Sequence, residues 1–321
     1  MEGKKVLVTG ANGYIGEHLG RIIGSRGYNS LGSVRQVRNK SSSRSYNEIK
    51  SSGSINGKTD WNDLLAGVDF VVHLAGCAHK IGRSASKAEH EYQVINRDAT
   101  VQLARQAAAR GIKRFIYISS IGVLGDSTDS NTFDNDSPYN PMNPYTQSKM
   151  EAEKALLLMS DNVDMEIVIL RPPLVYGPGA PGNFNRLLKL CSSSKILPFG
   201  AFTAYKSMVS LENFCDLIVH CLDAVLPKER IFVVSDNSNW SVAELISLMA
   251  RFLEIRVYNL SIPTSVLFFL AALFGRSDDV KKLANSLHVD STGTAESLKW
   301  SPCQKPVVGL LEAVEHFKKH K

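Results

Sequence analysis

The chain is long enough for a large hydrophobic core: it has 321 residues, of which 44% are hydrophobic and 21% are charged. This balance excludes an intrinsically disordered protein. The net charge of +6 suits a polyanionic ligand such as a nucleotide, but the sequence has no Lys/Arg block of the kind that binds nucleic acid.

The cysteines and the apolar segments indicate the compartment. Five Cys without C-x-x-C spacing argue against a disulfide framework or a metal site and favour a reducing, cytoplasmic location. The chain starts directly with a strand-like segment, so we expect no signal peptide. The longest apolar run, Val266–Phe274, is far shorter than the roughly 20 residues of a membrane span, and we expect a buried helix there.

The first half of the chain alternates short apolar runs with helical patterns. A helix is predicted from Ile15 onward and another over Val94–Arg110, whereas the Ser-rich stretch Arg38–Ser54 is predicted to be a long loop. Strands are predicted at Lys5–Thr9, Ser30–Val34, Asp69–Leu74, Arg114–Ser119 and Glu166–Leu170. This alternation predicts an α/β fold, a Rossmann-type doubly wound parallel sheet.

The second half of the chain shows mainly helical patterns and few strand-like runs. After Pro172 a turn-rich segment leads into mainly helical patterns, predicted over residues 183–191, 211–224, 241–253 and 310–318. We therefore expect a dinucleotide-binding domain over residues 1–172 and a smaller, mainly helical C-terminal substrate lobe over residues 173–321. One further strand, at 231–235, is expected to return to the first domain.

A glycine turn follows the first strand. Gly10, Gly13 and Gly16 would permit the tight turn, the close approach of a pyrophosphate to the backbone, and the packing of helix on strand, respectively. The phosphates would lie at the N-terminus of the following helix, where free N–H groups favour anions. Further candidate cofactor contacts in the same turn are Asn12, Tyr14 and Ile15.

The end of the second strand bears on the choice of cofactor. NAD enzymes of this kind place an acidic residue there to hold the ribose hydroxyls, but the sequence has no Asp or Glu between Gly20 and Glu48. Arg35 and Arg38 occupy this region instead, and a guanidinium suits a 2′-phosphate. We therefore favour NADP(H), with NAD(H) as the alternative.

A helix start carries the candidate catalytic residues. Asn143 is the predicted N-cap, followed by Pro at the first helical position. Tyr145 and Lys149 are four residues apart, so they share one face of the helix, and Lys149 is expected to lower the pKa of Tyr145. His73 lies in a buried strand and is expected to be packed. His79 follows the end of that strand, where ligands bind in such sheets, and is a candidate substrate contact.

Further motifs accompany the glycine turn and the Tyr–Lys pair. They are His73-Leu74-Ala75-Gly76, Val94-Ile95-Asn96, Ser119–Gly125 and Arg171–Gly179. The set covers most of the chain and resembles the extended short-chain dehydrogenase/reductase family, also called the NAD-dependent epimerases/dehydratases. Within it the chain is most similar to bacterial nucleotide-sugar 4-ketoreductases and 4-epimerases of polysaccharide biosynthesis, as indicated by Asn183-Phe184, Tyr205–Ser210 and Ser286–Asp290.

The resemblance implies roles for single residues. Tyr145 would be the acid/base, Lys149 would bind the nicotinamide ribose, and Ser120, with Ser119 as the competing choice, would hydrogen-bond the reacting oxygen. The implied cofactor contacts are Ser54, Ile55, Leu74, Ala75, Gly76, Asn96, Ser119, Tyr145, Lys149 and Pro172. The implied contacts to a nucleotide-diphosphate sugar are Ser120, Tyr145, Asn183, Phe184 and Lys206.

Lys206 replaces a common Arg and Ser54 a common Asp. The resemblance also implies a homodimer, formed through the helices at 94–110 and 145–159.

Three reactions compete within this family. Sugar dehydratases carry an Asp-Glu pair where this chain has Ile121 and Gly122, which disfavours dehydration. The basic end of the second strand favours a reductase that uses NADPH. The resemblance implies that such a reductase would act on the 4-keto group of a UDP-linked 4-keto-6-deoxy-sugar. The alternative is a UDP-hexose 4-epimerase, acting on UDP-glucose or UDP-N-acetylglucosamine, with tightly bound NAD. A non-catalytic NADP-binding regulator is a distant alternative, because such proteins typically lose the Tyr or the Lys that this chain retains.

Overall fold

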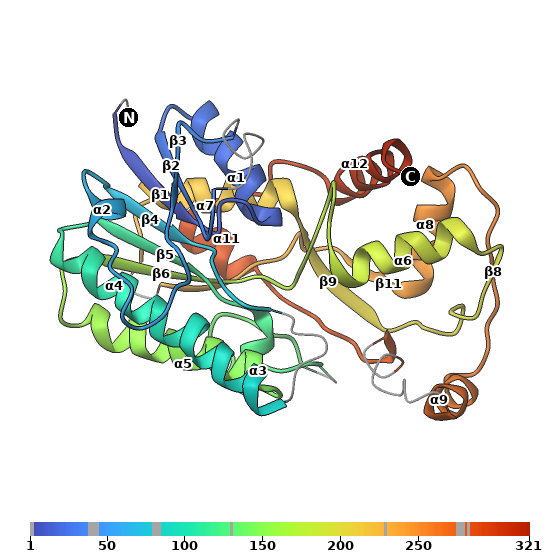
Figure 1. Cartoon of the computed structure of the whole chain (residues 1–321). Coiled ribbons are helices and arrows are strands. Elements are labelled where there is room, and N and C mark those ends of the chain that lie inside the picture. Colours follow the sequence, from blue (N-terminus) through green and yellow to red (C-terminus); the bar gives the residue numbers. More distant parts are fainter. Residues whose placement is uncertain are drawn as a thin grey trace.

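A seven-stranded parallel sheet forms the larger part of the protein (Figure 1). The computed structural model describes residues 3–37, 45–78, 85–128, 131–227, 230–273, 280 and 283–321. The strands, in spatial order, are β10 (Ile231–Val233), β6 (Glu166–Arg171), β5 (Arg114–Ile118), β4 (Phe70–His73), β1 (Lys5–Thr9), β2 (Asn29–Val34) and β3 (Glu48–Ser51). The chain winds outward in both directions from the junction of β1 and β4, the kind of switch point at which such sheets bind ligands. The predicted doubly wound sheet is confirmed.

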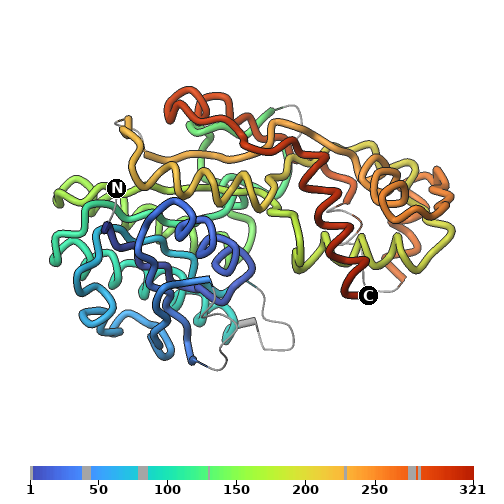
Figure 2. The backbone as a smooth tube through the Cα atoms, turned by 90° about the horizontal axis from the view of Figure 1, so that it is seen from above, coloured from blue at the N-terminus to red at the C-terminus, as the bar shows by residue number. Residues whose placement is uncertain are grey.

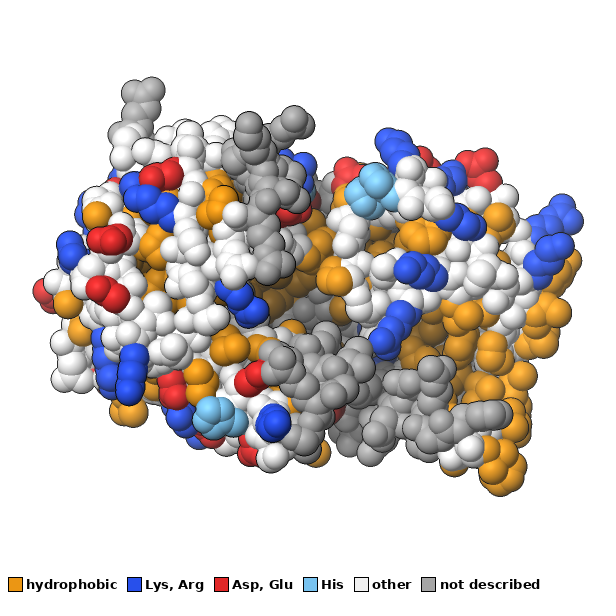
Figure 3. Space-filling model, viewed as in Figure 1, with side chains coloured by type: hydrophobic (Ala, Val, Ile, Leu, Met, Phe, Trp, Pro, Cys, Tyr) orange, Lys and Arg blue, Asp and Glu red, His pale blue; other side chains and the backbone are white. Residues whose placement is uncertain are grey.

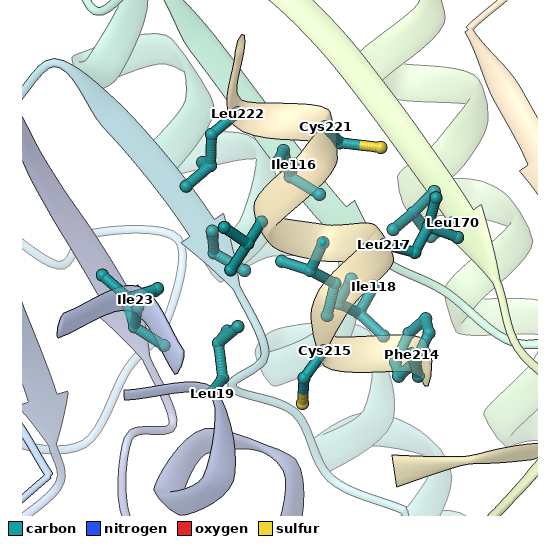
Figure 4. Packing of buried hydrophobic residues seen from close by; sticks show 14 of the residues in the cluster. Leu19, Ile23, Ile116, Ile118, Leu170, Phe214, Cys215, Leu217, Cys221 and Leu222 are labelled. Atoms are coloured by element: carbon teal, nitrogen blue, oxygen red, sulfur yellow. The ribbon is translucent and has the colours of Figure 1, made fainter. Parts of the chain in front are cut away.

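Helices cover both faces of this sheet and bury its apolar side chains. On one face lie α1 (Tyr14–Ser25) and α7 (Leu211–Asp223); on the other lie α2 (Asn62–Leu65), α4 (Ala99–Ala109) and α5 (Pro144–Ser160). Figure 4 shows Phe214 and Leu217 of α7 packed with Ile118 of β5 and Leu170 of β6. Each such buried side chain contributes about 1.5–3 kcal/mol, so this core holds the strand ends at the switch point in fixed positions.

Two elements of this region differ from the prediction. The strand β3 lies within the stretch predicted to be a loop; its only apolar residue is Ile49, so it lacks the pattern of a buried strand, and pairing with β2 at the sheet edge stabilises it. The predicted helix over Val94–Arg110 is present, but it starts earlier and is not α-helical throughout. A helix α3 (Ala85–Tyr92) passes into a π-helical segment (Gln93–Asp98) before α4 begins.

A smaller lobe lies beside the sheet, and the C-terminal helix ends on it (Figure 2). Its elements are β7 (Leu174–Tyr176), α6 (Gly182–Ser193), β8 (Ile196–Leu197), β9 (Tyr205–Ser210), β11 (Asn239–Ser241), α8 (Val242–Phe252), β12 (Tyr258–Asn259), α9 (Thr264–Leu273) and α12 (Pro306–Lys319). Its core lies between α6, α8 and α12. The helix α11 (Thr292–Leu298) instead adds Leu298 to the core beneath α7. The division of the chain at residue 172 stays a prediction.

The apolar run near residue 270 forms the helix α9, but the expectation that this helix is buried is wrong. Leu267 packs against the core of the lobe, yet none of the ten residues of α9 is buried. The helix lies at the edge of the lobe, so only one of its sides finds packing partners (Figure 1). Within the described parts of the chain, no helix combines the length and the apolar character that crossing a membrane requires.

Candidate functional site

The glycine turn after β1 packs closely against the loop that follows β4. Gly10 has a φ of +70°, and a Cβ there would lie 2.9 Å from the Ala75 nitrogen. A Cβ on Gly16 would collide with the Gly10 carbonyl oxygen, so both positions require glycine. Gly13 is the N-cap of α1 and makes no side-chain cap, which leaves the first N–H groups of the helix available to an anion. The turn therefore fits the pyrophosphate of a dinucleotide.

The other predicted residues of this turn expose different groups. Asn12 is exposed beside Gly13. The Tyr14 hydroxyl is buried beside Gly177, has no hydrogen-bond partner in the described structure, and has its pKa raised by burial. Ile15 packs against the core beneath α7. Tyr14 and Ile15 thus offer a cofactor their backbone N–H groups rather than their side chains.

The predicted adenosine end lies where β2 and β3 finish. The exposed Arg35 follows β2, and its carbonyl oxygen accepts a hydrogen bond of 2.8 Å from the Ser51 hydroxyl. Ser54 is also exposed, whereas Ile55 packs against the core on the α4 side of the sheet. Arg38 lies outside the described residues. Arg35 therefore places a cation at this end of the sheet.

Asn96, buried in the π-helical segment, fixes the loop after β4. Its side chain accepts a hydrogen bond from the Cys77 nitrogen at 2.8 Å, and it donates to the Cys77 carbonyl at 3.1 Å and to the Ser148 hydroxyl of α5 at 3.0 Å. A Cβ on Gly76 would lie 3.3 Å from the Asn96 oxygen and 3.5 Å from Lys149 Nζ. The loop that contains the predicted contacts at residues 74–76 is thereby held next to Lys149.

A buried hydrogen-bond chain lies beneath that loop. Nδ1 of His73 is 2.7 Å from the Thr9 hydroxyl, and Nε2 is 2.9 Å from the Thr100 hydroxyl. Thr100 in turn donates to the Asn96 carbonyl at 2.7 Å. Burial lowers the pKa of His73 to about 3, so the ring is neutral at physiological pH. His73 is packed, as expected, and joins β1 and β4 to the segment that carries Asn96.

The start of α5 orients the candidate catalytic face. The Asn143 side chain accepts a hydrogen bond from the Thr146 nitrogen at 3.0 Å, and the Thr146 hydroxyl accepts one from the Asn143 nitrogen at 3.2 Å. This capping box, with Pro144 at the first helical position, matches the predicted helix start. Such a cap contributes about 1 kcal/mol and sets the direction in which Tyr145 leaves the backbone.

The side chain of Tyr145 lies between Ser120 and Tyr92. Burial raises the pKa of Tyr145 to about 12, although a hydrogen bond with Ser120 acts in the opposite direction. Its ring meets that of Tyr92 edge-on, with centroids 5.9 Å apart. The lowering by Lys149 that we expected is not found. The Lys149 ammonium instead donates to the Ile118 carbonyl at 2.8 Å. In the protein without a bound cofactor, Tyr145 is therefore protonated at neutral pH.

A buried ion pair stands behind Lys149. The Glu153 carboxylate lies 2.7 Å from Nη2 of Arg171, with side-chain exposures of 0% and 2%. The Tyr139 hydroxyl donates to Glu153 at 2.9 Å, and the Arg171 guanidinium lies over the Tyr139 ring. Burial lowers the pKa of Lys149 to about 8, and the Glu153 charge opposes that change. The sequence analysis missed this pair, although Glu153 lies one helical turn beyond Lys149.

The loop after β5 presents two serines with different environments. The Ser119 hydroxyl is buried and lacks a hydrogen-bond partner within the described structure, so it can bind a ligand. The Ser120 oxygen accepts a hydrogen bond from the Gly122 nitrogen at 3.2 Å. The Pro172 carbonyl accepts one from the Ile121 nitrogen at 2.9 Å, which ties this loop to the end of β6.

A cavity of about 670 Å³ opens in the smaller lobe and contains three of the predicted substrate residues. The exposed Asn183 and the buried Phe184 line it from α6, and Lys206 lines it from β9. Its lining also includes Arg186, which the sequence analysis missed, and many apolar side chains. His79 lies outside the described residues, and the lining contains neither Ser120 nor Tyr145.

Lys206 is anchored rather than free in this cavity. Its ammonium donates a hydrogen bond to the Asn285 carbonyl, and burial lowers its pKa to about 8. The segment around Leu287 runs beside β9, where the Ser207 nitrogen donates to the Leu287 carbonyl at 2.8 Å. The late segment Ser286–Asp290, named in the sequence analysis, thus contributes Leu287 to the lining of the cavity.

Comparisons with known proteins agree with this architecture. The profile of the NAD dependent epimerase/dehydratase family matches residues 6–235. A UDP-glucose 4-epimerase of Vibrio cholerae is 37% identical over 317 residues, which cover 98% of this chain and 95% of the relative. An N-acetyl-alpha-D-glucosaminyl-diphospho-ditrans,octacis-undecaprenol 4-epimerase of Escherichia coli O157:H7 is 27% identical over 80% of this chain and 75% of its own.

Solved structures share the fold at lower identity. The UDP-glucuronic acid 4-epimerase of Bacillus cereus in complex with NAD superposes with a TM-score of 0.78, at 22% identity and over 98% of this chain and 99% of its own. MoeE5 in complex with UDP-glucuronic acid and NAD superposes with a TM-score of 0.77, at 21% identity and over 99% and 100% of the two chains.

Proposed function

The chain belongs to the NAD dependent epimerase/dehydratase family, and we propose that it is a UDP-sugar 4-epimerase that retains NAD. The observation that carries this proposal is the likeness to the V. cholerae UDP-glucose 4-epimerase, which extends over nearly all of both chains. The named complexes of the structural neighbours with NAD also support NAD rather than NADP(H). The epimerase alternative therefore has more support than the 4-ketoreductase that the sequence analysis favoured.

One observation favours the 4-ketoreductase as a second candidate. The end of β2 carries Arg35, a group that suits the 2′-phosphate of NADPH and contributes no carboxylate for a ribose hydroxyl. Arg35 is exposed, however, so its side chain can point away from a bound cofactor that has no 2′-phosphate. The catalytic residues are common to both reactions, and cofactor identity separates the two.

The reaction centre of the epimerase is Tyr145 with Ser120. NAD, when bound, would supply reversible hydride chemistry at the sugar C4, with inversion when the hydride returns to the opposite face, and its oxidised ring would add a positive charge to the site. The Tyr145 oxygen would accept the proton of the sugar 4-hydroxyl and later give it back, which is general acid–base catalysis worth about 10²–10⁴-fold in rate. The Ser120 hydroxyl would donate a hydrogen bond to the same sugar oxygen as it becomes a carbonyl.

The remaining predicted residues, together with Arg186, would hold the two ligands. Lys149 would donate to the nicotinamide ribose, and the glycine turn at residues 10–16 would bind the pyrophosphate through N–H groups of α1. Lys206 and Arg186 would place positive charge on the UDP diphosphate in the lobe cavity. The homodimer and the cytoplasmic location remain predictions, which light scattering and cell fractionation can test.

Cofactor release and sugar inversion together test the proposal. In the first experiment the purified protein is denatured and the released nucleotide is identified. In the second, fresh protein is incubated with UDP-glucose or UDP-N-acetylglucosamine, and the 4-epimers are separated. We expect NAD and epimerisation that falls at least about 10²-fold in Tyr145→Phe. Tyr258→Phe, on the far edge of the lobe, is the matched control and should stay active. Weakly held NADP, with NADPH consumed by keto-sugars and no epimerisation, would overturn the proposal.

A further inference from the structure

The helix α9 exposes apolar side chains that the proposed chemistry does not use. Its outer face comprises Val266 and Leu270, each 45% exposed, and Phe269 and Leu273, each 67% exposed. The helix carries no charged residue on any side. A helix that is apolar all round is normally enclosed by a protein core or by lipid, and soluble proteins rarely leave such a face in water.

The surroundings of α9 extend this apolar surface. The exposed Tyr258 and Leu260 immediately precede the helix, and the Leu260 carbonyl accepts a hydrogen bond from the Gly200 nitrogen at 3.0 Å. Figure 3 shows hydrophobic side chains gathered along the right-hand and lower edge of the lobe, where β8 and α9 lie in Figure 1. The surface is therefore a feature of the lobe edge rather than of one side chain.

The charge of the same part of the lobe indicates what covers this surface. The exposed cations Lys195, Arg251 and Arg256 precede β8 and β12, the paired strands at this edge, and Glu254 is the exposed anion between the two arginines. Glu254 is already paired with Lys318 at 3.0 Å. Basic side chains stand next to the apolar edge in Figure 3. Cations around an apolar helix fit a membrane with anionic lipids.

We propose that α9 docks this lobe on the surface of an anionic phospholipid membrane. The outer face of α9 would enter the boundary between headgroups and acyl chains, to a depth of about 5–10 Å. A ten-residue helix is about 15 Å long, so it lies on the bilayer and does not cross it. The surrounding cations would hold the lobe against the lipid phosphates.

A second copy of the chain fits this face less well. A stable dimer buries about 800 Å² on each partner, and charged residues are depleted at the core of such an interface. Two copies meeting there would also bring together two surfaces with an excess of cations. Both arguments favour lipid as the occupant.

Vesicle sedimentation of the full chain tests the proposal. Wild type is mixed with vesicles of phosphatidylcholine alone or of phosphatidylcholine with phosphatidylglycerol, at low and high salt. The test variant is Phe269→Ser/Leu273→Ser, and the matched control is Val37→Ser/Val225→Ser, which removes two apolar side chains that are 59% and 93% exposed and lie elsewhere. Thermal unfolding checks that both variants remain folded, and light scattering reports their oligomeric state.

We expect wild type and the control variant to sediment with the phosphatidylglycerol vesicles, more weakly at high salt. The partition coefficient of the α9 variant should fall at least about tenfold, the equivalent of about 1.4 kcal/mol. Absence of sedimentation by wild type, or equal sedimentation of the α9 variant, would overturn the proposal. It would also be overturned if wild type were an oligomer that the α9 variant alone dissociates, because the occupant would then be a second copy.

Discussion

Glu153→Gln should separate the structural role of Glu153 from its effect on Lys149. The carboxylate lies 2.7 Å from Nη2 and 3.1 Å from Nε of Arg171, and it accepts a hydrogen bond from Tyr139 at 2.9 Å. Removing one member of such a buried pair leaves the other charge uncompensated and costs about 3–5 kcal/mol. In a protein of this size that loss lowers Tm by of the order of 10 °C.

The same substitution should act on the titration of Lys149. Burial lowers the pKa of Lys149 to about 8, and the Glu153 charge raises it. Without that charge the pKa of Lys149 falls further. The unfolded chain, with a Lys pKa near ~10.4, then binds more protons than the folded one over a wider range. Stability should therefore rise with pH from a point below pH 8 up to about pH 10.4.

Thermal unfolding and an NMR titration of carbon-labelled lysines measure the two effects, with the Lys149 signal assigned by its loss in Lys149→Met. The matched control is Glu153→Met/Arg171→Met, which removes both charges and keeps the volume apolar. Such replacements are often neutral or stabilising, so Tm should recover while the pKa of Lys149 stays lowered. A single variant as stable as wild type, or a double variant with an unchanged Lys149 pKa, would refute the reasoning.

Three further changes test other parts of the site. In Gly16→Ala the new Cβ would collide with the Gly10 carbonyl, so the affinity for NAD, measured by calorimetry, should fall at least about tenfold. In the control Gly24→Ala, in the same helix, the new Cβ meets no atom within 4 Å, so NAD should bind as in wild type. Arg35→Glu should raise the ratio of NAD to NADP(H) affinity, and an unchanged ratio would show that Arg35 does not contact the cofactor. The pKa of His73 is about 3 in the folded protein and ~6.5 in the unfolded chain, so the neutral ring stabilises the fold above pH 6.5 and this stabilisation is lost as the pH falls. Between pH 8 and pH 5 the free energy of unfolding of wild type, measured with urea, should therefore fall by about 2 kcal/mol more than that of His73→Gln.

The sequence predicted most of the sheet because buried parallel strands are apolar along their whole length. Strand β3, with the sequence Glu-Ile-Lys-Ser, has one apolar residue, and it forms because β2 offers it an edge to pair with. The helix α9 shows the opposite limit. Its apolar composition predicts a buried helix, but burial requires other elements to pack against all of its sides, and the sequence of the helix does not show whether they do.

The candidate site likewise contains parts that could be predicted from the sequence and parts that could not. The glycine turn and the start of α5 were predictable because each is a local pattern in which spacing fixes which residues meet. The pairing of Glu153 with Arg171, and the bonds from Asn96 to Cys77, join separate elements and have no local signature. The pKa of Tyr145 was misjudged for a related reason: the nearby Lys was visible in the sequence, while the larger effect of burial was not.

The raised pKa of Tyr145 bears directly on the choice between the two candidate reactions. With a pKa of about 12, Tyr145 is protonated at neutral pH, which is the state from which a reductase needs it to donate. A 4-epimerase requires the same phenol to accept a proton in the first half of its cycle and to donate it in the second. The folded chain supplies only the donor state, because burial raises the pKa of Tyr145 and Lys149 is directed to the Ile118 carbonyl instead of the phenol. A cation close to the phenol would favour the acceptor state. In the proposed epimerase the oxidised nicotinamide would supply that charge, so NAD would have to be bound in its oxidised form before the sugar hydroxyl loses its proton.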